Sequence, residues 1–97
     1  MSEQTVRERV LLRLAQVIDP ETGVDVLRMK LIENLSVGEE GTVRYKFRPS
    51  SPLCPLAVTL ALEIKRTVAE VEGVTAQDVE VVGYVGADEL NALLREW

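Results

Sequence analysis

The sequence has no histidine and only one cysteine, Cys54. Without histidine the chain cannot form a Cys/His dyad or a Ser/His/Asp triad, and it has no imidazole to bind a metal. A single thiol excludes an internal disulfide and cannot supply the four ligands of a tetrahedral zinc or iron–sulfur site. Most hydrolytic mechanisms are therefore excluded, no catalytic residue is assigned, and any metal held by Cys54 must be shared.

Aromatic residues and positive charge are also scarce. The chain has four aromatic side chains and a net charge of −5. Such a surface repels phosphate backbones and offers few rings for base stacking. No apolar run is long enough to cross a membrane, and no basic segment precedes an apolar one as in a signal peptide. We therefore expect a cytoplasmic protein that binds neither nucleic acid nor membrane, folded as a single domain over residues 1–97.

Hydrophobic periodicity predicts the order helix, strand, strand, helix, strand, with a short C-terminal helix at the end. The expected segments are a helix from Thr5 to the Asp19-Pro20 stop, strands at 31–37 and 42–48, a helix at 55–71, a strand at 78–84 and a helix after Asp88. Thr5 and Glu8 have the spacing of a capping box. The fold class is α/β, a small mixed three-stranded sheet with two main helices packed on one face. The third strand could lie beside either of the other two.

The segment Ser50-Ser51-Pro52-Leu53-Cys54-Pro55 leads into the longest periodic stretch. Its two prolines hold the loop extended and predict that the helix begins at Pro55, with Cys54 as its N-cap. Unpaired N–H groups and the helix dipole favour a thiolate at that position, so Cys54 is expected to be exposed and reactive. The alternative is a small buried residue, as most free cysteines are.

A turn rich in carboxylates follows the first helix. In this turn Asp19 and Glu21 can terminate the helix, act as metal ligands beside Cys54, or accept hydrogen bonds from the N–H groups of the cysteine loop. Other ligands for a shared metal would come from a second copy, a small thiol or a partner protein. The second helix has more apolar surface than one sheet face needs, which favours a homodimer; the extra residues are Leu56, Val58 and Leu62.

Two motifs, taken together, resemble one protein family. The stretch from Val17 to Val24 resembles the "V-x-D-P-E-x-G" opening, and the stretch from Ser51 to Leu56 resembles the "T-x-x-x-C-P" core, of the SufT- and PaaD-like iron–sulfur cluster assembly family. The resemblance implies a small α/β domain, not an enzyme, which works with the assembly machinery to load clusters onto client apoproteins. It implies no cofactor beyond a transient iron–sulfur cluster.

The resemblance also assigns roles to particular residues. Cys54 matches the family's reactive cysteine, and Asp19 and Glu21 match its acidic motif. The loop around the cysteine is formed by Ser51, Pro52 and Pro55. The chain departs from the family where Met29-Lys30-Leu31 replaces Leu-Gly-Leu and where Tyr84-Val85-Gly86 replaces a tryptophan-rich segment. The additional cysteines of PaaD-type members are absent, which argues against that branch.

Three functions remain open at this stage. In the first, the protein is a cluster assembly or transfer factor in which Cys54 contacts the cluster. In the second, it is an interaction module of the same fold, and Cys54 is structural. The third, a thiol-dependent enzyme, is weaker because the sequence offers neither a general base nor a second cysteine to resolve an intermediate.

Overall fold

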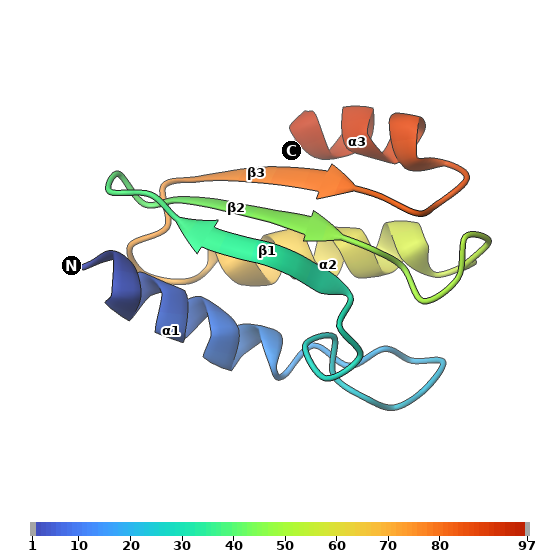
Figure 1. Cartoon of the computed structure of the whole chain (residues 1–97), viewed down its shortest axis with the longest axis horizontal. Helices are drawn as coiled ribbons and strands as arrows, with labels where there is room; N and C mark the ends of the chain where they lie inside the picture. The colour runs from blue at the N-terminus through green and yellow to red at the C-terminus, as the bar shows by residue number, and fades with distance from the viewer. Residues whose placement is uncertain (1, 97) are drawn as a thin grey trace.

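The computed structural model describes residues 2–96 (Figure 1). In chain order the elements are α1 (Glu3–Leu14), β1 (Ile32–Val37), β2 (Thr42–Phe47), α2 (Ala57–Ala69), β3 (Ala76–Val81) and α3 (Ala87–Arg95). This order confirms the predicted α/β class and the predicted succession of helices and strands. Within residues 2–96, no helix combines the length and hydropathy that crossing a membrane requires.

The three strands form one sheet in the order β1-β2-β3. β1 and β2 are antiparallel, and the turn between them is closed where the Gly38 N–H donates to the Thr42 carbonyl at 2.9 Å. β3 is parallel to β2, so α2 forms the crossover that connects them. This pairing settles the position of the third strand and leaves β1 and β3 as the two edges of the sheet.

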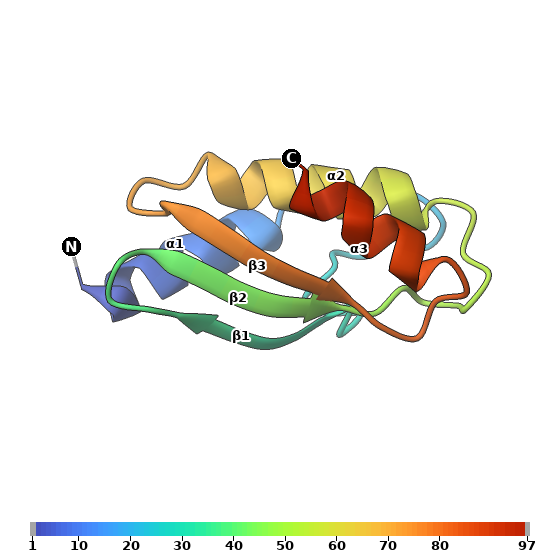
Figure 2. The same cartoon turned by 90° about the horizontal axis from the view of Figure 1, so that it is seen from above.

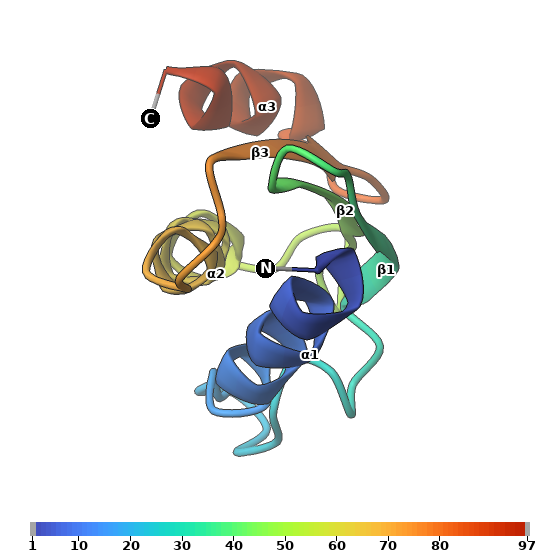
Figure 3. The same ribbon diagram turned by 90° about the vertical axis from the view of Figure 1, so that its left-hand side faces the viewer.

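Both main helices lie on the same face of the sheet, as predicted (Figures 2 and 3). Their apolar stripes and the inward side chains of the strands form one buried cluster. Its largest fully buried members include Phe47, Leu14, Ile64 and Leu94. Tyr45 also belongs to the cluster, and burial raises the pKa of its phenol well above the ordinary value.

The opposite face of the sheet is open, and it is not purely basic. Arg44 faces Asp78 at 3.9 Å, and the Arg48 Nε lies 2.8 Å from the Glu33 carboxylate. α3 does not cover this face but lies on the helix side, beyond β3 (Figure 3). Acidic side chains therefore lie beside the basic residues of this face, Arg44, Lys46 and Arg48, and the face carries charges of both signs.

The first helix begins and ends earlier than predicted. Ser2 is the N-cap, and its Oγ accepts a hydrogen bond from the Thr5 N–H at 3.2 Å, so the predicted capping box at Thr5 is wrong. At the other end the helix stops at Leu14, and Ile18 pairs with Asp25 in an isolated antiparallel bridge. The helix was predicted to be too long because apolar residues after Leu14 keep the helical spacing. Buried residues of a loop can fall on the same period by chance.

The third strand also lies earlier than the predicted range 78–84. Its ladder with β2 runs from Ala76 to Val81, and the last bond beyond it joins the Val82 N–H to the Phe47 carbonyl at 3.0 Å. Gly83 then adopts a φ of 65°, which turns the chain away. The valine-rich pattern of the third strand does not reveal where its partner β2 ends. In the structure the end of β2 sets the end of β3.

Candidate functional site

The loops that carry both motifs lie at one end of the molecule, where β2 and β3 end and α2 and α3 begin (right side of Figure 1). They are the segments 15–31, 48–56 and 82–86. Two backbone hydrogen bonds join them: the Arg48 N–H donates to the Leu31 carbonyl at 2.8 Å, and the Val85 N–H donates to the Pro52 carbonyl at 3.0 Å. The fold therefore gathers motifs that are far apart in the sequence into one group of loops, which we call the loop end.

The antiparallel course of α1 and α2 brings the acidic motif to the loop end. Arg9 pairs with Glu72, and Arg13 pairs with Glu70, both just after the end of α2, so advancing along α1 leads back toward α2. The segment that follows α1 therefore runs toward the start of α2 (Figure 1). Asp19 follows α1 and Cys54 precedes α2, so both lie in loops at this end.

Cys54 is not the N-cap of the second helix. α2 begins at Ala57 after the N-cap Leu56, and no side chain caps it. The Ala57 N–H donates to the Cys54 carbonyl at 3.3 Å in a tight turn, and the first bond of the helical ladder joins Leu60 to Leu56. Pro55 therefore lies inside this turn and not at the first helical position, and the predicted N-cap interaction with the thiol is absent.

The Cys54 side chain is buried, which contradicts the expectation of an exposed thiol. Its exposed fraction is 3%, whereas that of the preceding Leu53 is 73%. The turn directs Leu53 outward and Cys54 inward. The sequence therefore located the cysteine loop correctly but predicted the wrong orientation of the Cys54 side chain. Cys54 lies outside the main apolar cluster.

Asp19 is the one charged residue that is buried among those described, with an exposed fraction of 1%. Its Oδ1 accepts a hydrogen bond from the Glu21 N–H at 2.9 Å, and its backbone carbonyl accepts one from Gly23 at 2.8 Å. Within residues 2–96 the Oδ2 atom has no hydrogen-bond partner. A buried oxygen in this state costs about 1–3 kcal/mol, so it calls for a reason other than stability.

Among the described residues, the Asp19 carboxylate is hydrogen-bonded within its own turn and not to the cysteine loop. The carboxylate of Asp19 accepts from its own turn, and no hydrogen bond links its Oδ2 to Cys54. Glu21 is exposed. In the part of the chain that is described, no three Cys, Asp or Glu side chains gather closely enough to hold a metal ion. A cluster contacted by Cys54 would need ligands from outside this set.

Arg48 connects the segments of the loop end, a role that the sequence gave no sign of. Its backbone N–H donates to the Leu31 carbonyl in the first loop, and its side chain pairs with Glu33 at 2.8 Å. Its guanidinium lies against Gly83. A Cβ on Gly83 would come within 2.6 Å of the Arg48 Nη1. The glycine therefore makes room for the arginine that crosses it.

Lys30 occupies the position where the family pattern has glycine, and it adopts a φ of 61°. This left-handed conformation is favourable for glycine and costs other residues about 1–2 kcal/mol. Lysine at this position therefore adds backbone strain that glycine would not have.

Apolar side chains are exposed at the loop end. Leu53 and Val85 have exposed fractions of 73% and 72%, and the hydrogen bond from Val85 to Pro52 brings their segments together. Ile18 at 46% and Val58 at 39% lie in the neighbouring loop and in the first turn of α2. The exposed pair was missed from sequence, because an apolar residue in a loop gives no sign of the direction in which it points.

Comparison with known proteins identifies the family. A family model described as "Iron-sulfur cluster assembly protein" matches residues 7–81. An uncharacterised protein of Methanocaldococcus jannaschii is 36% identical over 90 residues, which cover 93% of this chain and 95% of that protein. The Fe-S protein maturation auxiliary factor YitW of Bacillus subtilis is 31% identical over 80 residues, covering 82% of this chain and 78% of that protein.

A solved structure supports the same assignment. The crystal structure of a domain of unknown function, DUF59, from Bacillus anthracis superposes with a TM-score of 0.75 at 28% identity, covering 84% of this chain and 78% of that chain. The resemblance inferred from the two motifs is thereby confirmed. The region matched by the family model includes Asp19, Glu21 and Cys54. The chain belongs to the family of iron–sulfur cluster assembly proteins.

Proposed function

We propose that this protein is a non-enzymatic factor that assembles or transfers iron–sulfur clusters for client apoproteins, with Cys54 as the thiol that contacts the cluster. Family membership supports the general role, and the relative named as an auxiliary maturation factor supports a role other than catalysis. One observation carries the assignment of the site: the only thiol and the buried, unpartnered carboxylate oxygen of Asp19 lie at the same end of the molecule.

Contact with a cluster requires the cysteine loop to open, because Cys54 is buried. Besides the bond from the Ala57 N–H to the Cys54 carbonyl, three hydrogen bonds hold that loop in place. The Cys54 N–H donates to the Ser51 carbonyl at 3.1 Å, the Leu53 N–H donates to the Ser51 Oγ at 3.2 Å, and the Pro52 carbonyl accepts from Val85. Rupture of these contacts would release the thiol without disturbing the sheet or the helices.

The cluster is cargo in this proposal. The metal ligand is the thiolate, so the thiol proton leaves when iron binds. One chain supplies one sulfur, and the remaining ligands come from a second copy, a small thiol or the partner that delivers or receives the cluster. Assembly proteins and client apoproteins are therefore the expected partners, and a homodimer is one way to complete the site. The proposal places the protein in the cytoplasm, where thiols stay reduced.

Anaerobic reconstitution with iron and sulfide tests the proposal. The wild-type protein should gain visible absorption and should transfer a cluster to an apoferredoxin. Cys54→Ser and Cys54→Ala should load the apoferredoxin at least about tenfold more slowly. Asp19→Asn keeps an acceptor for the Glu21 N–H and should fold, yet load slowly. Circular dichroism of each variant separates loss of function from loss of fold.

The burial of Cys54 favours a second candidate, an interaction module in which this residue only packs. The alanine variant distinguishes the two functions, because it removes the sulfur with little change in volume and adds no polar group. A folded Cys54→Ala protein that loads the apoferredoxin at the wild-type rate would rule out a role for the thiol and leave the module.

A further inference from the structure

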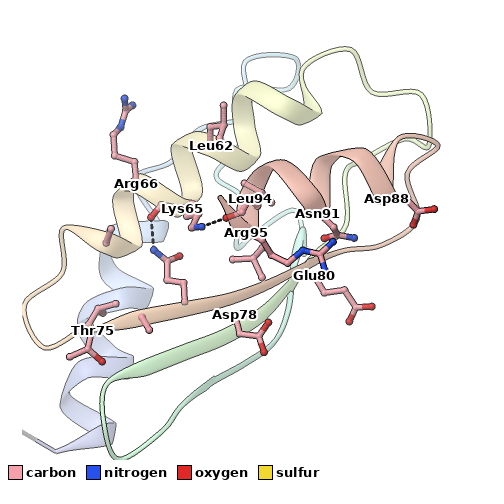
Figure 4. A pocket seen from close by; sticks show the side chains of 15 residues that line it. Leu62, Lys65, Arg66, Thr75, Asp78, Glu80, Asp88, Asn91, Leu94 and Arg95 are labelled. Atoms are coloured by element: carbon pink, nitrogen blue, oxygen red, sulfur yellow. Dashed lines mark hydrogen bonds between the residues drawn. The ribbon is translucent and has the colours of Figure 1, made fainter. Parts of the chain in front are cut away.

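A groove of about 1000 Å³ runs along the outer side of β3, from Thr75 before the strand to Asp88 in the first turn of α3 (Figure 4). α2 forms one wall with Leu62, Lys65 and Ala69, and the last turn of α3 closes it with Leu94 and Arg95. The Lys65 Nζ donates to the Leu94 carbonyl and so joins the two helices above the strand. The groove is therefore a preformed space between elements that are fixed to each other.

The floor of the groove is the edge of the sheet. Every residue from Ala76 to Glu80 lines it, including the half-buried side chains on the helix side and the exposed ones on the open side. Since a single face would contribute only alternate residues, the groove follows the edge itself. β3 has β2 on one side and no strand on the other.

Part of this edge is already satisfied by a side chain. The Asn91 Oδ1 accepts from the Val81 N–H at 2.7 Å, and the Asn91 Nδ2 donates to the Val81 carbonyl at 3.2 Å. Val82, the next residue, bonds inward to β2. By the alternation of a strand, Gln77 and Val79 also direct their N–H and carbonyl groups outward. Within residues 2–96 no strand pairs with them there.

The side chain of Gln77 keeps this floor rigid. Its Oε1 accepts from the Tyr45 hydroxyl at 2.9 Å, and its Nε2 donates to the Lys65 carbonyl at 2.7 Å. The strand is thus tied both to the sheet and to α2 at the point where its backbone is open. A fixed row of outward donors and acceptors beside a groove is the arrangement that binds an extended peptide as an added strand.

Charges on the open face specify what that peptide should carry. Glu33 of β1 lies opposite Lys46 of β2, and Lys46 lies opposite Glu80 of β3. Arg44 of β2 lies opposite Asp78 of β3. The row through Lys46 is therefore acidic, basic, acidic, and the row through Arg44 is serine, basic, acidic. A strand added beside β3 would meet two carboxylates, Asp78 and Glu80. Lysine or arginine at alternate positions would continue the series, because cross-strand pairs of opposite charge are stabilising.

A second copy of this chain is a poor occupant. If two β3 edges paired antiparallel about Val79, Asp78 of one chain would face Glu80 of the other on both sides. Like charges directly opposite each other are destabilising in a sheet. The same acidic residues that favour a basic strand thus oppose self-pairing at this edge.

We propose that the β3 edge binds an extended segment of a partner protein as a fourth strand, with basic residues facing Asp78 and Glu80 and apolar residues between them facing the groove. The segment docks on Gln77 and Val79 and stops at Asn91, which already occupies the edge at Val81. No residue of the cysteine loop 48–56 lines this groove, so the edge can hold a partner while that loop is in use.

The test uses two synthetic peptides, an acetylated alternation of valine and lysine and a matched alternation of valine and glutamate. Nuclear magnetic resonance titration of the full chain gives affinities, and hydrogen exchange reports the amides of Gln77 and Val79. We expect the valine–lysine peptide to bind about tenfold more tightly or better, and to slow exchange at both amides at least about tenfold.

Two variants control the test. The double variant Asp78→Lys/Glu80→Lys changes only exposed side chains and should reverse the preference between the peptides. Val79→Pro removes one outward N–H, which an edge strand tolerates, and should weaken binding of the valine–lysine peptide. Equal affinity for both peptides, binding without slowed exchange, or no binding would each overturn the proposal. Slowed exchange in the free protein that increases with its concentration would assign the edge to a second copy and overturn it too.

Discussion

The two ends of the sheet differ in how completely their polar and apolar groups are satisfied. At the end where β1 turns into β2, the Thr75 hydroxyl donates to the Glu40 carbonyl at 2.6 Å and the Thr75 N–H donates to the Gly41 carbonyl at 3.0 Å. The loop end instead keeps a carboxylate oxygen of Asp19 without a partner and leaves Leu53 and Val85 exposed. One end is built for stability, and the other retains features that stability alone would remove.

This difference predicts that substitutions at the two ends change stability in opposite ways. Changes at the turn end should lower the free energy of unfolding, whereas some changes at the loop end should raise it or leave it unchanged. The three predictions below run from the largest expected effect on stability to the smallest.

Gly41→Ala should destabilise the protein by about 3 kcal/mol or more. Gly41 has a φ of 87°, and a Cβ there would lie 2.2 Å from the Gly73 carbonyl oxygen, a contact that requires the backbone to move. Urea denaturation followed by circular dichroism measures the loss. Gly38→Ala is the matched control, because its nearest neighbour would be 3.8 Å away; its cost should stay below about 1 kcal/mol. Similar losses in both variants would show that the contact is not the cause.

The same contrast explains how much could be predicted from the sequence. Element order, the buried stripes of α1 and α2 and the common face of the two helices follow from periodicity, because burial imposes it on long segments. The position of β3 beside β2 and the shifted ends of β3 do not follow, since they depend on a partner strand far away in the sequence. Long-range pairing is visible only once the chain has folded.

The candidate site shows a similar limit. The motifs identified the family and located Cys54 and Asp19, but the orientation of Cys54 was predicted wrongly because a turn before Ala57 displaces the helix start. The unpartnered oxygen of Asp19 could not be predicted, since it depends on which N–H groups the surrounding turn supplies. The role of Arg48 could not be predicted either, since its contact with Gly83 joins residues that are far apart in the sequence.

Lys30→Gly should stabilise the protein by about 1 kcal/mol, because glycine adopts the observed φ of 61° without steric cost. Lys30 is exposed, so little packing is lost. Thermal and urea denaturation measure the gain, and Lys30→Ala is the control. Alanine has the same Cβ as lysine and should change stability by less than about 0.5 kcal/mol. A gain of similar size in both variants would point to the removed charge and not to the backbone.

Leu53→Ser and Val85→Ser should have the smallest effect on stability and a large effect on function. Both side chains are more than two thirds exposed, so the free energy of unfolding should change by less than about 0.5 kcal/mol. If client proteins dock at the loop end, these side chains lose contact with water on binding, and burial of each should contribute about 1.5–3 kcal/mol. Loading of an apoferredoxin should therefore fall about tenfold or more at subsaturating client, while the absorption of the reconstituted protein stays unchanged.

Leu12→Ser is the matched control for this last prediction. Leu12 lies on α1 and is 69% exposed, so its replacement removes a similar apolar surface outside the cysteine and β3–α3 loops. It should load the client at the wild-type rate. An equal loss in Leu12→Ser and Leu53→Ser would mean that general surface hydrophobicity drives the encounter, and the loop end would then hold the thiol without being the docking surface. Unchanged loading in Leu53→Ser and Val85→Ser would also show that the loop end is not the docking surface. Removing apolar side chains that a partner covers should lower the affinity for that partner.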